Sequence, residues 1–194
     1  MRILHGSLQF ASGGAARAAR RICESQQMAG LEISTLSASP PHFTAPAAEV
    51  CLINPDKAEV RARLESALLA RLRLRDGNIR NLGLLPSEVP SLVDESSTDL
   101  VNLHWVGHSF LAGWQVRKLD KPVVWTLHDL WAASGTLHYP VGRDLINESG
   151  ASNFFASQQS RRSRFVERVM LEIKKRSNRE ITFVAPSQWL AEEA

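Results

Sequence analysis

Histidines and aromatic residues gather just after two short apolar segments of the sequence. His104 and Trp105 follow one of these segments, His128 and Asp129 follow the other, and Tyr139 comes shortly afterwards. Imidazole groups exchange hydrogen bonds with hydroxyl groups, and aromatic faces pack against the apolar faces of sugars. We therefore expect these residues to bind a polyhydroxyl ligand, with a purely structural role for each histidine as the alternative.

A glycine pair precedes a run of strong helix formers near the start of the chain. Gly13 and Gly14 stand before residues 15–23, which are mostly alanine and arginine. Glycines at a helix start let backbone N–H groups approach a bulky anion, and the helix dipole favours negative charge there. The pair predicts an anion site, with a plain tight turn as the alternative. It matches neither the dinucleotide-binding fingerprint nor the P-loop.

A hydrolase is a further alternative. Ser109 follows a strand-like segment and has a glycine two residues before it, as in the nucleophile elbow of α/β-hydrolases. Asp120 or Asp129, and then His138, complete the order that a triad requires. However, Leu111 stands where the second glycine of the elbow belongs, and the triad would crowd into about thirty residues. The pattern therefore favours this alternative least.

No metal site is expected from the spacing of the histidines. His104 and His108 lie in a predicted turn rather than on one face of a helix, and no carboxylates stand at matching spacing. We therefore expect no metal ligands in this chain.

Alternating strands and helices are expected to position these residues. Short apolar or alternating segments predict strands, and 3.6-residue periodicity between turn residues predicts helices. Residues 78–98 look irregular. The predicted strands are 3–8, 32–36, 100–103, 123–127 and 181–184, and the predicted helices are 15–29, 55–75, 110–119, 163–177 and one capped by Ser187. This order predicts an α/β fold, a Rossmann-like parallel sheet flanked by helices, with ligands at the carboxyl ends of the strands.

The composition is that of a globular domain. The chain has 194 residues, of which 44% are hydrophobic and 22% charged, and its net charge is +3. This balance excludes general disorder and gives no reason to expect nucleic-acid binding. No apolar stretch is long enough to span a bilayer, the start lacks an export signal, and two cysteines are too few for a disulfide framework. We expect a cytoplasmic protein.

Residues 161–179 form a strongly basic segment with helical periodicity. The apolar residues Phe165, Val166, Val169, Met170 and Ile173 recur on one helical face. The pattern predicts either a helix that packs on the sheet with a solvated basic face or peripheral contact with an anionic membrane. The basic residues of the segment are Arg161, Arg162, Arg164, Arg168, Lys174, Lys175, Arg176 and Arg179.

Six segments recur in the order found in a known family. They are residues 13–19, 99–106, 110–111, 121–131, 138–139 and 186–191, and KPVVWTLHDLW at 121–131 is the most specific. Together they resemble the N-terminal half of glycosyltransferase family 4 enzymes of the bacterial exopolysaccharide, capsule and colanic-acid branch. The resemblance implies a GT-B architecture, in which two Rossmann-like domains react in the cleft between them. Residues 1–194 would form the acceptor-side domain, and the chain would be a fragment without the C-terminal nucleotide-sugar-binding domain.

The resemblance also implies an activity and a set of site residues. The enzyme would be a retaining hexosyltransferase that moves a sugar from a UDP- or GDP-sugar to a saccharide or lipid-linked acceptor in polysaccharide biosynthesis, without cofactor or metal. His128 would be the catalytic residue, and Gly13 and Gly14 would lie against the donor diphosphate. The residues expected on the acceptor side are Arg17, His104, Trp105, Asp129 and Tyr139. The isolated chain is expected to be inactive, and a non-catalytic sugar- or nucleotide-binding module is the alternative.

Overall fold

Six short parallel strands form one sheet in the order β3-β2-β1-β4-β5-β6. The structure is a computed structural model, and it describes residues 1–39, 50–139, 160–177 and 180–194. This strand order, with a reversal between β1 and β4, is that of the Rossmann fold. The strands are β1 Arg2–Gly6, β2 Glu32–Ser37, β3 Val50–Leu52, β4 Leu100–Leu103, β5 Val123–Thr126 and β6 Ile181–Val184. The predicted α/β fold with a parallel sheet is confirmed.

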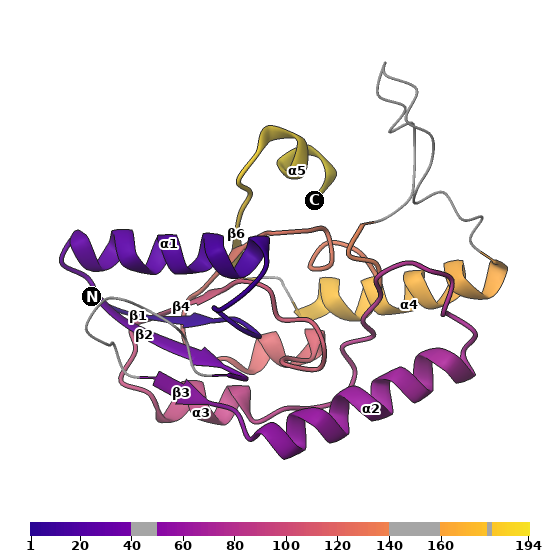
Figure 1. Cartoon of the computed structure of the whole chain (residues 1–194). Coiled ribbons are helices and arrows are strands. Elements are labelled where there is room, and N and C mark those ends of the chain that lie inside the picture. Colours follow the sequence, from indigo (N-terminus) through magenta and orange to yellow (C-terminus); the bar gives the residue numbers. More distant parts are fainter. Residues whose placement is uncertain (40–49, 140–159, 178–179) are drawn as a thin grey trace.

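Helices cover both faces of the sheet (Figure 1). On β1, Ile3 packs with Ala19 and Cys23 beneath α1, whereas Leu4 packs with Val93 of α3 in the largest core cluster. Successive side chains of a strand point to opposite faces, so each face of this buried sheet acquires its own core. The helices are α1 Gly14–Met28, α2 Pro55–Arg71, α3 Val89–Glu95, the 3-10 helix η1 Gly113–Lys118, α4 Arg161–Ser177 and α5 Gln188–Glu193.

Local sequence signals explain where two of the helices begin. The Asn54 side chain accepts a hydrogen bond from the backbone N–H of Lys57, and Pro55 occupies the first position of α2. The Ser187 side chain accepts one from the backbone N–H of Leu190 at the start of α5. Both caps satisfy N–H groups that a helix start leaves without partners, and the predicted capping role of Ser187 is confirmed.

Three elements differ from the prediction. Strand β3 and helix α3 were not expected, since β3 has only three residues and α3 only seven, too few for a clear period. The predicted helix 110–119 is replaced by the shorter 3-10 helix η1, which follows a turn that holds His108 and Ser109 at positive φ angles of 49° and 60°. The loop expected at Pro40 and Pro41 lies outside the described residues.

In the part of the chain that the structure describes, none of the helices has the length and apolar character needed to cross a bilayer.

Candidate functional site

A crevice of about 430 Å³ lies at the carboxyl ends of β1, β4 and β5. Open parallel sheets bind ligands at this edge, and the reversal of strand order between β1 and β4 is where a crevice is expected. The crevice brings the glycine pair and the aromatic and histidine residues together. Of the residues predicted for the site, those that line it are Gly13, Gly14, Trp105, His128, Asp129 and Tyr139.

The start of α1 presents bare backbone to this crevice. Gly13 has φ 91° and ψ 167°, a conformation that residues with a side chain avoid, and Gly14 is the first residue of the helix. No side chain caps this helix start and its first turn holds no acidic residue. A Cβ added to either glycine would meet nothing within 4 Å. The first N–H groups of α1 therefore offer an open site for an anion.

The rings of three histidines form a hydrogen-bonded row that ends at the crevice. Nδ1 of His5 lies 2.9 Å from Nε2 of His104, and Nδ1 of His104 lies 3.0 Å from Nε2 of His128. At the inner end, Nε2 of His5 lies 2.8 Å from Oε1 of Gln26 on α1. The rings of His5 and His104 are within 15° of coplanar, so the nitrogen lone pairs point along the row. We call these four residues the histidine row.

Strand alternation explains why the three histidines meet. Residues two apart on a strand share a face, so His5 shares the α1 face with Ile3. Likewise, His104 continues the face of Asn102, and His128 continues that of Thr126. The hydroxyl of Thr126 donates to Oδ1 of Asn102 at 3.0 Å, which shows that these two side chains share one face across β4 and β5. Because β1, β4 and β5 are neighbours in the sheet, the row runs diagonally across their carboxyl ends, from His5 through His104 to His128 at the crevice.

Burial favours the neutral form of every ring in the row. Desolvation lowers the pKa of His5 to about 4, against a smaller opposing effect of its hydrogen bond with Gln26. Burial also holds the pKa of His104 well below its ordinary value and lowers the pKa of His128. All three imidazoles are therefore neutral near pH 7.

The Asp129 carboxylate holds the wall of the crevice together. Its Oδ2 accepts from Nε1 of Trp105 at 2.7 Å and lies 2.6 Å from Nδ1 of His138, while its Oδ1 accepts from the backbone N–H of Trp131 at 2.9 Å. His138 also meets Oδ1 of Asn81 through Nε2. Asp129 therefore fixes the indole of Trp105 that faces the crevice, and its contact with an acceptor stays a prediction.

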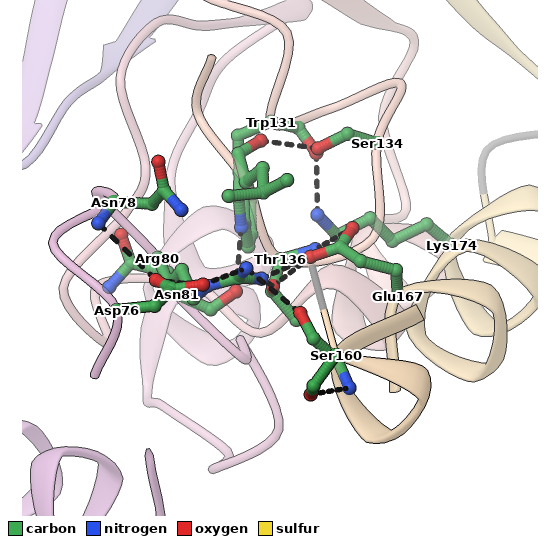
Figure 2. A network of polar contacts seen from close by, with 12 residues as sticks. Asp76, Asn78, Arg80, Asn81, Trp131, Ser134, Thr136, Ser160, Glu167 and Lys174 are labelled. Atoms are coloured by element: carbon green, nitrogen blue, oxygen red, sulfur yellow. Dashed lines mark hydrogen bonds and ion pairs between the residues drawn. The ribbon is translucent and has the colours of Figure 1, made fainter. Parts of the chain in front are cut away.

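A buried arginine ties the loop before Tyr139 to α4 (Figure 2). The guanidinium of Arg80 donates to Asp76 at 2.7 Å, to Glu167 of α4 at 2.8 Å and to the hydroxyl of Thr136 at 2.8 Å. The backbone N–H of Thr136 also donates to Glu167. Gly135 lies directly on the backbone of α4, where a Cβ would overlap the Glu167 carbonyl. The loop and α4 are thus joined without a gap.

A family model described as Glycosyltransferase Family 4 matches residues 12–194 of this chain. The chain belongs to glycosyltransferase family 4. No curated protein matches the chain. The family match agrees with the six-stranded parallel sheet, and it assigns the chain to glycosyltransferases in general.

Two predicted acceptor residues of this glycosyltransferase domain do not line the crevice. His104 is only 2% exposed and lies beneath the surface, where it contacts His5 and His128. Arg17 is exposed on the first turn of α1, outside the crevice lining. His104 therefore supports His128 from below, and a contact between Arg17 and an acceptor stays a prediction.

Ser109 has no hydrolase geometry. Its side chain is 3% exposed, and its hydroxyl donates to the carboxylate of Glu65 rather than to a histidine. His138, the base expected for a triad, is held by Asp129 and Asn81. A nucleophile must be reachable and activated by a base, so this arrangement does not support the hydrolase alternative.

The sequence did not single out His5, Gln26 or Asn81, which lie behind the residues that line the crevice. The sequence does contain a signal that His5 belongs to the site: it lies on the same strand face as Ile3, and His104 and His128 follow the ends of two other strands. Gln26 and Asn81 give no such signal, since only the packing of α1 and of the 134–139 loop brings them to a histidine. Across the described ranges, no three His, Cys, Asp or Glu side chains gather as metal ligands do.

The basic helix α4 differs in detail from the prediction. Lys174, counted among the solvated basic residues, is 1% exposed; its ammonium nitrogen donates to the backbone carbonyl of Trp131 at 2.5 Å and its pKa is lowered well below the usual value by burial. Arg179 lies outside the described residues. The apolar stripe is divided, since Met170 is buried whereas Phe165 and Val169 are 68% and 40% exposed. The remaining basic residues, all exposed, are Arg161, Arg162, Arg164, Arg168, Lys175 and Arg176.

Proposed function

We propose that this chain is the acceptor-side domain of a retaining glycosyltransferase of polysaccharide biosynthesis, of the exopolysaccharide, capsule and colanic-acid branch. It transfers a hexose from a UDP- or GDP-sugar to a saccharide or lipid-linked acceptor. The observation that carries the proposal is that Gly13, Gly14 and His128 line one crevice. A nucleotide-sugar needs both an anion site for its diphosphate and polar groups beside its sugar.

The two parts of the crevice fit the two parts of such a donor. The uncapped start of α1 supplies N–H groups and a favourable dipole for a diphosphate, whose negative charge increases as it leaves. His128 is neutral and bonded to His104 through Nε2, so its other nitrogen is left for a sugar hydroxyl. Trp105 and Tyr139, on the same wall, provide aromatic surface for an acceptor.

A second, nucleotide-sugar-binding domain completes the proposed active site. Phe183 and Val184 of β6 and Trp189 of α5 are 41%, 44% and 45% exposed, next to Pro186 at the crevice. Exposed apolar surface beside a ligand site is typical of surface that another domain covers. The family 4 domain described here is therefore expected to need that partner for efficient transfer.

Replacing Gly13 by alanine tests the anion site. The φ of 91° disfavours a side chain, so the backbone should shift and turn the first N–H groups of α1 away from the ligand. We expect the dissociation constant for UDP or GDP to rise about fivefold, or about 1 kcal/mol, in titration calorimetry of the intact protein.

The matched control is Gly77→Ala, because Gly77 also has a positive φ of 84° with open space around it but lies outside the crevice. This variant should bind with unchanged affinity. Equal affinity of both variants and the parent protein would remove the glycine pair from the diphosphate site.

Helix α4 is proposed as a peripheral contact with the anionic cytoplasmic face of a membrane. Phe165 and Val169 lie four residues apart on one exposed helical face, and basic residues surround them. Basic helices with exposed apolar residues bind at the headgroup level of anionic bilayers.

Flotation of the protein with liposomes checks this contact. We expect binding to liposomes with anionic phospholipid, little binding to zwitterionic ones, and reduced binding of Phe165→Ser. Leu64→Ser is the matched control, since Leu64 is 55% exposed on α2. Equal flotation of both variants and the parent would contradict the role of α4.

A further inference from the structure

The histidine row has a direction, because each of its hydrogen bonds needs one donor and one acceptor. With Oε1 of Gln26 as the acceptor, Nε2 of His5 must carry the proton at that end. A neutral imidazole has a single N–H, so Nδ1 of His5 accepts from Nε2 of His104. By the same rule, Nδ1 of His104 accepts from Nε2 of His128.

The opposite direction is the alternative, and the orientation of the Gln26 amide, whose oxygen faces His5, disfavours it. If the side-chain group facing His5 were a donor, every proton in the row would move to Nδ1, and His128 would carry Nδ1–H. The two arrangements place the ring atoms identically. They differ only in whether the terminal acceptor stands at the Gln26 end of the row or at the His128 end. In this structure the acceptor is Oε1 of Gln26, which lies on α1, the helix whose first turn lines the crevice.

We propose that Gln26, acting through His5 and His104, holds His128 in the Nε2–H tautomer, so that Nδ1 of His128 presents a lone pair to the crevice. Among the described residues, no side chain or backbone group forms a hydrogen bond with this Nδ1. His5 and His104 are 0% and 2% exposed, so no bulk water can replace a partner within the row. Gln26, His5 and His104 are thus positioning residues.

Burial supports the single-proton rule on which this inference depends. Since the pKa of His5 and of His104 lies far below neutrality, neither ring carries a second proton that would break the donor–acceptor order. A partner that fixes one nitrogen of an imidazole determines what the other nitrogen can do.

The consequence for transfer rests on the proposed function. A lone pair on Nδ1 of His128 accepts a hydrogen bond from a ligand hydroxyl, and it cannot donate one to the departing diphosphate. His128 would then orient the sugar, while the start of α1 supplies the groups that meet the anion.

Nitrogen NMR of the full chain labelled with 15N-histidine tests the tautomer directly. The chain has six histidines, and comparison with a His128→Gln sample identifies the signals of His128. We expect a protonated Nε2 and an unprotonated Nδ1 in the parent chain. Gln26→Glu, which keeps an acceptor, should retain this pattern, whereas Gln26→Leu should give a mixture of tautomers.

Gln27→Leu is the matched control, since Gln27 is a half-exposed neighbour on α1 whose side chain forms no hydrogen bond with the row among the described residues. It should leave the His128 signals unchanged. A protonated Nδ1 in the parent chain, or an unchanged pattern in Gln26→Leu, would overturn the proposal.

Kinetics of the intact protein separate this inference from the proposed function. Gln26→Leu should lower kcat about three- to tenfold with little change in KM for the donor, and Gln26→Glu should restore kcat. If the tautomer changes in Gln26→Leu but kcat does not, the row stands as described and the tautomer of His128 has no role in transfer. If neither the NMR pattern nor kcat changes, Gln26 has no positioning role.

Discussion

His128→Ala is expected to lower kcat for sugar transfer at least about tenfold, since a polar group aimed at the reacting part of a substrate contributes this much or more. The variant removes the one ring of the histidine row that lines the crevice and leaves the start of α1 intact. Binding of UDP or GDP should therefore change little, so the loss should appear in kcat rather than in affinity for the nucleotide.

The measurement is the initial rate of transfer or hydrolysis with a panel of UDP- and GDP-sugars, on the protein that contains both domains. His108→Ala is the control, because His108 is exposed on the turn after Trp105 and does not line the crevice. Unchanged turnover in His128→Ala would remove this residue from the active site. Nucleotide binding without any transfer by the parent protein would instead favour a binding module.

Arg80→Ala is expected to lower the free energy of unfolding by about 3–5 kcal/mol, because removal of one partner leaves a buried charge without compensation. The Arg80 side chain is 2% exposed and bonds both Asp76 and Glu167. The arginine also lowers the pKa of Asp76 against the opposing effect of burial. Without it, the carboxylates of Asp76 and Glu167, whose side chains are 26% and 16% exposed, would both lose their cation.

Urea denaturation followed by tryptophan fluorescence gives this free energy. Arg63→Ala is the matched control, because Arg63 also pairs with an acid four residues away, Glu59, but both side chains are more than half exposed. It should cost no more than about 0.5 kcal/mol. A similar small loss in Arg80→Ala would mean that the contact between the loop and α4 does not depend on this network.

The sequence was sufficient for elements with a clear period and insufficient for contacts set by packing. The alternation of strands and helices predicted the parallel sheet, and the residues after β4 and β5 included His128 at the crevice. His104 was placed in the same site by its position after a strand, although the next residue, Trp105, is the one that lines the crevice. Successive residues at the end of a strand point to opposite faces of the sheet. The sequence alone does not give the residue at which a strand ends, so it does not decide which of the two faces the ligand.

The network around Arg80 could not be predicted for a different reason. Its partners come from residues 76, 136 and 167, which no short-range pattern connects. The same holds for Gln26, whose neighbours in sequence are equally polar. Such contacts depend on how α1 and α4 pack on the sheet, so they can be identified only in the folded structure.

Gly135 is the point where the loop before Tyr139 packs directly against α4. Because a Cβ at this position would overlap the backbone of Glu167, no side chain separates the loop from the helix. A larger residue at position 135 would therefore have to push the loop and α4 apart.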